Sequence, residues 1–428
     1  MILLYTEHIS ERLNYICHFI LREQLGITYT ITTQKPETEE SSIFIINYSN
    51  QSIAAAKIII RPQGLLFEQD IKPQNINCDQ KENRVILFKT ENDDLGFDLF
   101  SATFYLISRY EEYLPHQKDE YGRYDFKESI AYKNGFLKLP LVNIWIELLA
   151  SEIKKHHPEC QMYRPPFKTI VSYDIDMAWS YKNKGILRNI GGFIRKPSIE
   201  RLKVLWRIRK DPFDSFDLMD TQNQKNKFET IYFFLVAKSL GEYDKNISPS
   251  NQSMRKLINQ KASRYNIGLH PSWKSNSNPL LLNEEKKQLE RISKKAITNS
   301  RQHYIKLNLP ETYRKLIKNE INNDFSMGYG NINGFRASAA SSFFWFDLKE
   351  NKTTSLRLYP FCFMDATSHY SLNQSAEEGS QELFYFKNIC QQYDGLFISI
   401  FHNNIIGDEK TFKGWKETYL KFIVFIVR

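Results

Sequence analysis

The chain has 428 residues, of which 42% are hydrophobic, 14% aromatic and 25% charged, and this composition is typical of a globular protein, not a disordered one. Its length predicts two domains with a sizeable buried core. The five cysteines are odd in number and form no CxxC pair, which argues against a disulfide framework and for a reducing compartment. We recognise no signal peptide and no apolar stretch long enough to span a membrane, so we expect a cytoplasmic protein.

Residues 1–160 alternate short apolar runs with helical patterns and predict a small α/β domain. Three runs rich in β-branched residues, ILLY, SIFIIN and KIIIRP, are typical of strands. Residues 8–25, 97–114 and 141–155 have the apolar periodicity of helices. Three prolines between residues 156 and 167 then predict a linker.

Strands and helices alternate more regularly between residues 165 and 428. The predicted strands are 168–173, 230–236, 266–269, 296–300, 324–327, 356–360 and 396–401, and the predicted helices are 253–264, 282–294, 310–319 and 378–393. This alternation indicates a parallel sheet, either doubly wound or closed into a barrel. In both architectures, functional sites collect at the carboxyl ends of the strands.

Polar residues with catalytic potential follow several of these strands directly. They are Asp174 and Asp176 after the first strand, in SYDIDMAW, His270 after the third, Arg301 and His303 after the fourth, and His402 after the last. Because parallel strands end at the same edge of a sheet, we expect these side chains to form one site. In the acid pair, one carboxylate could bind a cation while the other takes a proton. A helix cap with a neighbouring surface acid explains the pair as well.

The net charge of +9 is concentrated in one segment. Between residues 182 and 211 there are ten Lys or Arg and only two acids, Glu200 and Asp211. A solvated basic helix explains this charge, and so does a patch for an anionic partner: a membrane surface, an acidic glycan or nucleic acid. Nucleic acid is disfavoured, because the segment has no recognised motif and few aromatic residues. The hypothesis that follows is a peripheral membrane contact through residues 182–210, at the inner face of the membrane.

The order of these motifs resembles that of the polysaccharide deacetylase family (NodB homology, carbohydrate esterase family 4). An acid pair, a histidine motif, an Arg-x-x-Tyr motif, the segment DFSMGYG and a last strand ending in His carry the resemblance. More narrowly, the chain resembles a Bacteroidetes branch of two-domain deacetylase-like proteins over nearly its whole length, through the phrases FDLFSATFYLISRYEEYL, IGLHPSW, SRQHYIKL, MGYGNINGFRAS and FKGW.

The resemblance implies a distorted (β/α)7 barrel over residues 165–428, preceded by a smaller α/β accessory domain over residues 1–160. It also implies a hydrolase that uses a divalent metal, usually zinc. Its carbohydrate substrate would be an N-acetylated or O-acetylated sugar of a bacterial surface polysaccharide or its precursor, lipid-linked or anionic, from which it removes the acetyl group.

The resemblance further implies roles for individual residues. The catalytic residues would be Asp174 as general base, Arg301 as its partner and His402 as general acid; the metal ligands would be Asp176, His270 and His303; and the substrate contacts would be Ser272, Tyr304, Asp324 and Arg336. A backbone N–H near Tyr304 would hold the oxyanion. The aromatic run at residues 341–348 is either core packing or a surface that stacks on sugars.

Two positions depart from the family pattern. The family places a second histidine four residues after the first, where this chain has Lys274, and an ammonium group cannot ligate zinc. We favour His303 as the replacement, because on an extended backbone it shares a face with Arg301. The alternatives are a weak site with two protein ligands, or a catalytically inactive glycan-binding protein. The second departure is Ile175, which separates the two acids, so that their roles could be exchanged.

Overall fold

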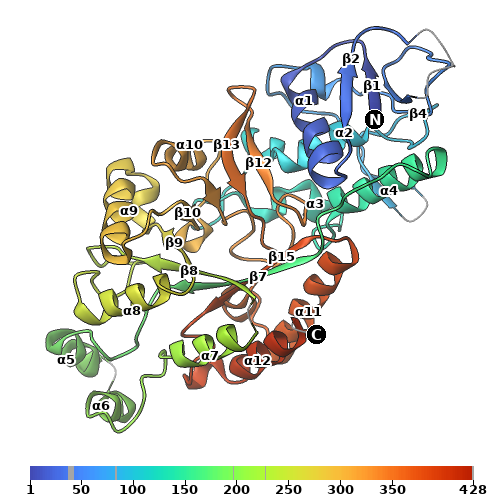
Figure 1. Cartoon of the computed structure of the whole chain (residues 1–428). Coiled ribbons are helices and arrows are strands. Elements are labelled where there is room, and N and C mark those ends of the chain that lie inside the picture. The colour runs from blue at the N-terminus through green and yellow to red at the C-terminus, as the bar shows by residue number, and fades with distance from the viewer. Residues whose placement is uncertain (37–42, 82–83, 196, 227, 427–428) are drawn as a thin grey trace. The chain divides into compact units, whose positions relative to one another are not determined.

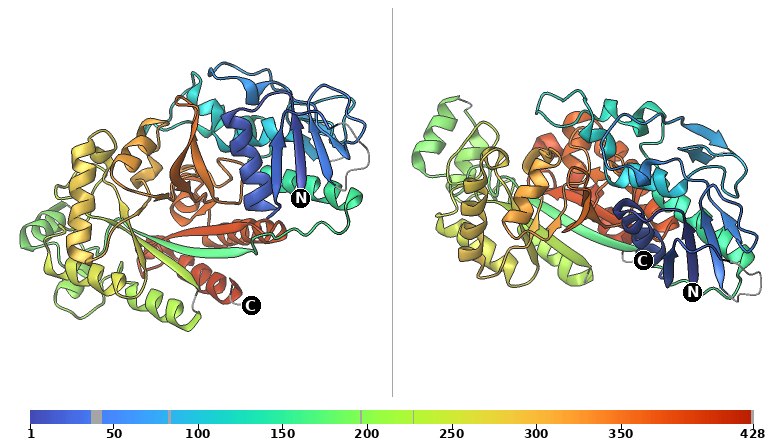
Figure 2. Two further views of the ribbon diagram at one scale, coloured as in Figure 1. Left: turned by 45° about the horizontal axis from the view of Figure 1, so that its top comes forward. Right: turned by 90° about the horizontal axis from the view of Figure 1, so that it is seen from above.

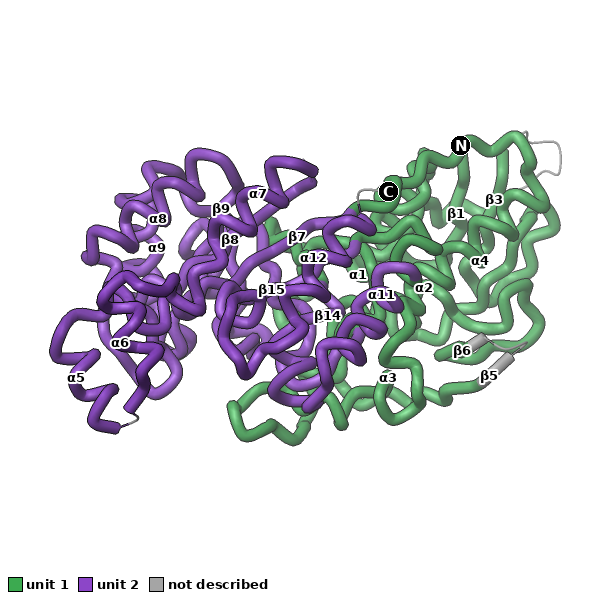
Figure 3. Tube along the Cα trace, turned by 90° about the horizontal axis from the view of Figure 1, so that it is seen from below, with its two compact units in different colours: residues 1–168, 335–360, 389–396 green, residues 169–334, 361–388, 397–428 purple. Residues whose placement is uncertain are grey.

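The structure is a computed structural model that describes residues 1–36, 43–81, 84–195, 197–226 and 228–426. Its internal contacts divide the chain into two compact units (Figure 3). The first comprises residues 1–168, 335–360 and 389–396, and the second comprises residues 169–334, 361–388 and 397–428. The first boundary follows the predicted linker. The two later segments of the first unit interrupt the stretch for which the sequence predicts one continuous domain.

A four-stranded parallel sheet lies near the N-terminus of the first unit (Figure 1). Its strands are β1 (Ile2–Thr6), β2 (Tyr29–Thr32), β3 (Phe44–Tyr48) and β4 (Ile58–Ile59), in the order β2-β1-β3-β4. The three predicted strands correspond to β1, β3 and β4, and β2 is an addition. Every residue of β3 is buried, as expected for a strand with both neighbours in place and both faces covered.

The helices of the first unit follow the predicted pattern with one interruption. Residues 8–25 form α1 (Glu11–Cys17) and η1 (His18–Gln24), and α4 (Leu141–His156) is the last predicted helix. The predicted helix at 97–114 is divided into α2 (Leu99–Ile107) and the short η3 (Tyr110–Tyr113). Arg109 separates them, because its φ of 56° lies in the left-handed region and cannot continue a right-handed helix.

The first unit also contains a hairpin that corrects one prediction and decides between the two alternatives for the aromatic run at 341–348. Strands β12 (Phe343–Asp347) and β13 (Lys352–Leu358) pair antiparallel, so the predicted strand at 356–360 lies in an antiparallel hairpin. Phe343, Trp345 and Phe346 of β12 are each at most 1% exposed, so this aromatic run packs in a core and offers little surface to a sugar. The remaining elements are η2 (Leu65–Phe67), β5 (Asp79–Lys81), β6 (Arg84–Ile86), η4 (Phe126–Glu128) and α3 (Ile130–Lys133).

The second unit is built on a largely parallel sheet. Its strands are β7 (Lys168–Ile175), β8 (Glu229–Leu235), β9 (Asn266–His270), β10 (Asn299–Ser300), β11 (Asn323–Asp324), β14 (Phe363–Met364) and β15 (Leu396–His402), in the order β11-β10-β9-β8-β7-β15-β14. The pairs from β7 through β11 and the pair of β14 with β15 are parallel. The parallel sheet is as predicted, although β10 and β11 are shorter than the predicted strands.

Closure of this sheet into a barrel is not confirmed. Among the described residues no strand ladder joins β11 to β14. Two backbone hydrogen bonds link the chain after β11 to the chain before β14: Phe361 N donates to Met327 O at 3.1 Å, and Gly334 N donates to Cys362 O at 2.9 Å. The chain after β11 and the chain before β14 are therefore connected by irregular backbone.

Helices alternate with these strands. They are α5 (Ile186–Arg195), α6 (Ile199–Leu205), α7 (Phe216–Asn226), α8 (Gln252–Ala262), α9 (Pro279–Ser293), α10 (Glu311–Lys318), α11 (Ala376–Gln392) and α12 (Trp415–Ile426), with short turns η5 (Trp273–Asn276), η6 (His303–Ile305), η7 (Thr367–Ser371) and η8 (Lys410–Phe412). The four predicted helices correspond to α8 through α11. Asn278 caps α9 and Pro279 occupies its first turn, which explains where that helix begins. Within the described ranges, no helix has both the length and the apolar character to cross a membrane.

Candidate metal centre and catalytic site

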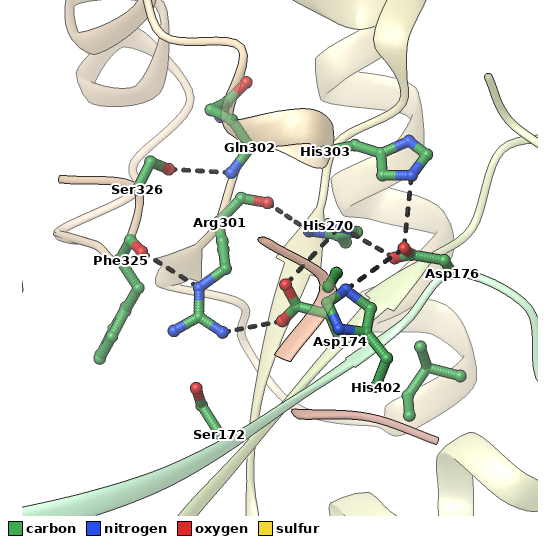
Figure 4. A network of polar contacts seen from close by, with 12 residues as sticks. Ser172, Asp174, Asp176, His270, Arg301, Gln302, His303, Phe325, Ser326 and His402 are labelled. Atoms are coloured by element: carbon green, nitrogen blue, oxygen red, sulfur yellow. Dashed lines mark hydrogen bonds and ion pairs between the residues drawn. The ribbon is translucent and has the colours of Figure 1, made fainter. Parts of the chain in front are cut away.

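The predicted catalytic and metal-binding side chains meet in the second unit (Figure 4). Asp174 and Asp176 stand at the end of β7, His270 ends β9, Arg301 and His303 follow β10, and His402 ends β15. Their strands are parallel neighbours or near neighbours, so the carboxyl ends present these residues at one edge. The local pattern of an apolar run that stops at a polar residue is thus repeated at β7, β9 and β15, whereas β10 consists of two polar residues.

Asp176, His270 and His303 form a group that can hold a metal ion, since one ligand atom from each lies within 4.8 Å of the others. His270 Nε2 is 3.1 Å from Asp176 Oδ1, and His303 Nε2 is 3.6 Å from Asp176 Oδ2. These are the three ligands that the sequence suggested. Lys274, at the position of the family's second histidine, is exposed in η5. The group therefore takes its second imidazole from the chain that follows β10.

Each histidine at this edge holds its second ring nitrogen against an oxygen atom. Nδ1 lies 2.5 Å from the Arg301 carbonyl oxygen in His270, 3.0 Å from Asp244 Oδ1 in His303 and 2.6 Å from Asp365 Oδ1 in His402. Carbonyl and ionised carboxylate oxygens only accept hydrogen bonds, so Nδ1 carries the proton in all three rings. In a neutral ring Nε2 is then a bare lone pair, which is the form that binds metals.

Asp176 consequently faces nitrogen atoms that, in neutral rings, have no proton to donate. Its Oδ1 is buried and has no hydrogen-bond partner among the described residues, although His270 Nε2 is 3.1 Å away. Two acceptors at this distance repel each other unless a proton or a cation lies between them. Two imidazole nitrogens and a carboxylate oxygen are a donor set that zinc and related divalent metals accept, and oxygen-anchored Nδ1 atoms are their usual support. These residues fit a divalent metal.

The pKa shifts of these residues also indicate that the group favours a positive charge at its centre. Burial alone raises the pKa of Asp176, but the neighbouring His303 and His270 hold it well below its usual range, so the carboxylate stays ionised. Burial alone lowers the pKa of His303, yet Asp176 and Asp244 outweigh it and raise that pKa to about 9. A metal and a proton therefore compete for His303 Nε2, and metal affinity should rise with pH.

Asp174 lies deeper than Asp176 and has a different partner. It is 1% exposed, and its Oδ1 accepts a hydrogen bond from Arg301 Nη1 at 2.8 Å. Arg301 is itself fixed, because its Nε donates to the Phe325 carbonyl oxygen at 3.0 Å and its guanidinium lies 4.3 Å from the Phe233 ring centroid. Asp174 Oδ2 points toward the metal group, 3.9 Å from His270 Nε2. Arg301 thus occupies one oxygen and leaves the other for proton transfer.

His402 is held by Asp365 through two contacts. The backbone N–H of His402 donates to Asp365 Oδ2 at 2.7 Å, and its Nδ1 donates to Oδ1 at 2.6 Å. Burial alone lowers the pKa of His402, but the charge and hydrogen bond of Asp365 outweigh it and raise that pKa to about 10. At neutral pH the ring is protonated, and its Nε2, 3.5 Å from Asp176 Oδ2, is placed to give a proton. His402 therefore has the properties of a general acid.

Sequence reasoning missed the two carboxylates that orient His303 and His402. Asp365 follows β14, a two-residue strand in FCFMD, whose apolar run ends in an acid as β7 does. That repeated pattern was a usable signal. Asp244 lies in the loop after β8 and caps the Trp273 backbone N–H at 3.0 Å, and no pattern in the sequence distinguishes it from a surface acid.

Tyr304, a predicted substrate contact, belongs to a group of aromatic rings beside the metal group. It is 37% exposed, and its ring centroid lies 5.2 Å from that of Tyr243, 5.7 Å from that of Trp273 and 4.7 Å from that of His303. Tyr243 and Trp273 stack on each other at 4.1 Å and are partly exposed. We call Tyr243, Trp273 and Tyr304 the aromatic cluster; partly exposed rings of this kind can receive the apolar face of a sugar.

Ser272 and Asp324 are buried beside the site. Ser272 is 3% exposed, with a backbone N–H that donates to Glu285. Asp324 is fully buried, and it accepts hydrogen bonds from the hydroxyls of Ser300 and Ser326. Burial raises its pKa to about 6. These contacts give Asp324 a role in fixing the chain after β10 and β11, which differs from the predicted contact with substrate.

Arg336 belongs to the first unit and not to the unit that holds the metal group. It is 1% exposed, and its guanidinium donates to Glu112 Oε1 at 2.8 Å and to Glu112 Oε2 at 2.6 Å. A buried guanidinium bound to a carboxylate in this way has a structural role. The prediction that Arg336 contacts substrate therefore gains no support.

Comparisons with known proteins assign no function to the whole chain. Residues 2–158 match the model of a family of unknown function (DUF7033). Among curated proteins, none matches the chain.

Solved structures similar to this chain include a protein assigned as a polysaccharide deacetylase from Mycobacterium smegmatis (TM-score 0.41, 10% identity, covering 61% of this chain and 85% of the other). The polysaccharide deacetylase Bc1974 of Bacillus cereus is a second (TM-score 0.31, 8% identity, covering 60% and 86%). With such scores these similarities decide neither the fold nor the function of this chain.

Proposed function

We propose that this protein is a metal-dependent hydrolase that removes an acetyl group from an acetylated sugar of a bacterial surface polysaccharide or its precursor. One observation carries the proposal. Asp176 faces the Nε2 atoms of His270 and His303, whose Nδ1 protons are held elsewhere, so this group is matched to a divalent cation. The acetyl group and the sugar are suggested by the resemblance of the sequence motifs to polysaccharide deacetylases.

A divalent metal bound by Asp176, His270 and His303 supplies a Lewis acid that polarises the acetyl carbonyl and brings the pKa of water to about 7. Asp174 then acts as the general base. Its Oδ2 faces the metal group and takes a proton from the attacking water, while Arg301 keeps Oδ1 hydrogen-bonded. Because Arg301 is held by Phe325 and Phe233, the carboxylate cannot turn away from the water.

His402, whose Nε2 lies 3.5 Å from Asp176 Oδ2, completes the reaction as the general acid. The oxygen of water forms a bond to the acyl carbon, and the bond from that carbon to the sugar nitrogen or oxygen breaks. The departing atom takes a proton from His402 Nε2, and Asp365 stabilises the imidazolium before the transfer. The products are acetate and a free amine or hydroxyl: the proton that Asp174 took from water returns to His402, and the released acetic acid loses its proton to solvent.

The aromatic cluster is the proposed platform for the sugar. Tyr304 directly follows the ligand His303, so a ring stacked on the cluster would carry its acetyl group close to the metal group. Lys306 Nζ lies 3.5 Å from the Trp273 ring centroid, which places a positive charge next to this platform. An acidic substituent on the glycan would find a partner there.

The test begins with metal removal. The purified protein is stripped with a chelator, reloaded with Zn²⁺, Co²⁺ or Mn²⁺, and assayed for acetate release from N-acetylated chito-oligosaccharides and from O-acetylated xylan. We expect one metal per chain and activity only in the reloaded protein. His303→Ala should lose both, whereas His369→Ala, in the same unit but outside the metal group, should keep both.

A parent protein that binds no metal at any supplied concentration would overturn the hydrolase proposal. The alternative, a catalytically inactive glycan-binding protein, would then be tested by calorimetric titration with the same oligosaccharides. Activity that persists in metal-free His303→Ala would also contradict the proposal.

A further inference from the structure

Helices α5 and α6 expose an unusual amount of apolar surface. Eight of the nineteen exposed large hydrophobic side chains in the described ranges lie in this short part of the chain: Ile186, Leu187, Ile190, Ile194, Ile199, Leu205, Trp206 and Ile208. The four on α5 recur at a spacing that places them on one face of a helix, and they are 52% to 87% exposed. Such a face is normally buried against something.

The segment that contains these two helices carries most of the net positive charge of the protein. Ten Lys or Arg and two acids lie between residues 182 and 211. Lys182, Arg195, Lys203 and Arg207 are exposed, beside the apolar side chains. An exposed apolar face with flanking basic residues and a tryptophan is the composition of helices that lie in the interface of a membrane.

A basic cavity of about 670 Å³ lies along α5. Lys184, Arg188, Arg195 and Arg201 all line it, and no carboxylate is found among its described lining residues. Burial, with the charges of Arg188 and Arg201, lowers the pKa of Lys184 to about 8, so these cations are crowded together. An anion in this cavity would relieve that crowding. The cavity thus provides, independently of the apolar face, a place for a phosphate group.

The two helices are held in place at several points. Asp211 accepts hydrogen bonds from the backbone N–H groups of Ser180, Tyr181 and Lys182, each at 2.8 Å, and so ties the two ends of this segment together. Arg201 Nη1 of α6 donates to the carbonyl oxygen of Asn189 in α5 at 2.7 Å. The surface is therefore preorganised, and little conformational entropy is lost when it binds.

The guanidinium of Arg201 passes close to Gly192 of α5, where a Cβ atom would make that side chain shift. In Figures 1 and 2 both helices, drawn in green, lie at the periphery of the second unit. Their apolar face is thus open to a large partner.

We propose that α5 and α6 form a docking surface for a membrane of anionic phospholipids. The apolar side chains of α5 and the Trp206 region enter the headgroup and acyl boundary, and the basic side chains pair with lipid phosphates, one of them in the cavity. Nucleic acid or an acidic glycan would match the charge but would leave eight apolar side chains in water. This function is separate from hydrolysis, because none of the metal ligands lies in these helices.

The proposal is tested with the full chain by sedimentation with vesicles of phosphatidylcholine alone and of phosphatidylcholine with 30% phosphatidylglycerol. We expect the protein to bind the anionic vesicles. Its affinity for the neutral vesicles should be lower by roughly tenfold or more. Leu187→Ser/Ile194→Ser should lower the affinity for anionic vesicles by about tenfold or more. Its control, Leu240→Ser/Leu280→Ser, removes two exposed leucines of the same unit and should leave binding unchanged.

The charge is tested separately. Lys203→Glu/Arg207→Glu should weaken binding to anionic vesicles by roughly tenfold or more, whereas Lys256→Glu/Lys287→Glu, which changes the net charge equally, should have a small effect. Equal loss in both pairs would mean that only the net charge acts, and it would overturn the proposal.

Three further outcomes would also overturn it. In the first, the parent protein does not bind anionic vesicles at low salt. In the second, Leu187→Ser/Ile194→Ser leaves vesicle binding unchanged while DNA or heparin competes with the vesicles. In the third, the protein self-associates, and this double substitution abolishes the self-association without changing lipid binding. Asp176→Ala separates this proposal from the hydrolase, because it should lose metal and still bind vesicles.

Discussion

Each compact unit contains a carboxylate that faces groups able to carry a positive charge. The carboxylate of the first unit is part of the structural core, whereas that of the second unit belongs to the metal group. In the first unit, Glu112 is 4% exposed and accepts hydrogen bonds from Arg109 at 2.7 Å and from Arg336 at 2.8 and 2.6 Å. Burial alone raises the pKa of Glu112, but the two guanidinium groups outweigh it and lower that pKa to about 2. The negative charge of Glu112 is thus balanced by guanidinium groups, which are permanently charged.

In the second unit, Asp176 is 28% exposed and faces imidazole Nε2 atoms. Arginine always has protons to donate, whereas a histidine whose proton is held at Nδ1 presents a lone pair unless it is charged. The difference shows how a structural carboxylate can be told from a functional one. Glu112 has a complete set of donors, and Asp176 leaves room for a cation.

The largest expected effect comes from removing Asp176. In Asp176→Ala, stoichiometric metal should be lost, and because the metal contributes several kcal/mol to the transition state, acetate release should fall by at least about a thousandfold. Metal analysis and the acetate assay measure this. The urea midpoint of the metal-free protein should fall only modestly, because Asp176 is 28% exposed and water screens its contacts with the imidazolium forms of His303 and His402. Equal metal in variant and parent would contradict the assignment.

The next effect concerns the proton donor. His402→Gln should lower kcat by about 10²–10⁴-fold with metal content unchanged. In Asp365→Asn the pKa of His402 should fall from about 10, because the carboxylate that raises it is gone. The protonated ring is the active form, so the alkaline fall in kcat should begin at a lower pH in this variant. An unshifted alkaline limb would remove His402 as the acid.

Glu112 offers the opposite test, on stability. Glu112→Gln leaves Arg109 and Arg336 without their counter-charge, and it should lower the free energy of unfolding by about 3–5 kcal/mol in urea titrations at pH 7. The pKa of Glu112 in the folded protein, about 2, lies below its ordinary value of 4.5, so this contribution is present above pH 4.5 and is lost as pH falls toward 2. The parent and the variant should therefore converge in acid.

Two controls sharpen this test. Glu120→Gln changes an exposed glutamate of the same unit and should leave the unfolding free energy nearly unchanged. Metal content in the folded Glu112→Gln protein should match the parent. Loss of metal without loss of stability would show that the distinction between the two carboxylates is mistaken.

The smallest expected effect is at the support of His303. Asp244→Asn removes the charged acceptor at Nδ1, and it should weaken metal affinity by about 10–100-fold without abolishing binding. Competition with a fluorescent zinc chelator measures the change. An affinity equal to that of the parent would mean that Asp244 serves only its hydrogen bond to Trp273.

Features that depend on neighbouring residues could be predicted from the amino-acid sequence. Apolar runs that stop at Asp174, His270 and His402 identified the long strands and their carboxyl ends, because strand length and polarity are local properties. The alternation of strands with helices was enough to predict a parallel sheet. The resemblance of the motifs, more than periodicity, supplied the roles of the individual side chains.

The hydrogen-bond and ion-pair partners of these residues could be read only from the tertiary structure. Strand β14 has two residues and exists through pairing with β15, so Asp365 could not be placed next to His402 in advance. Asp244 reaches His303 across 59 positions of the chain, and Arg336 is bound by Glu112 across 224. Contacts at such separations follow from the packing of distant segments, which no local pattern encodes. The same packing turned three histidine side chains so that their Nε2 atoms face one carboxylate.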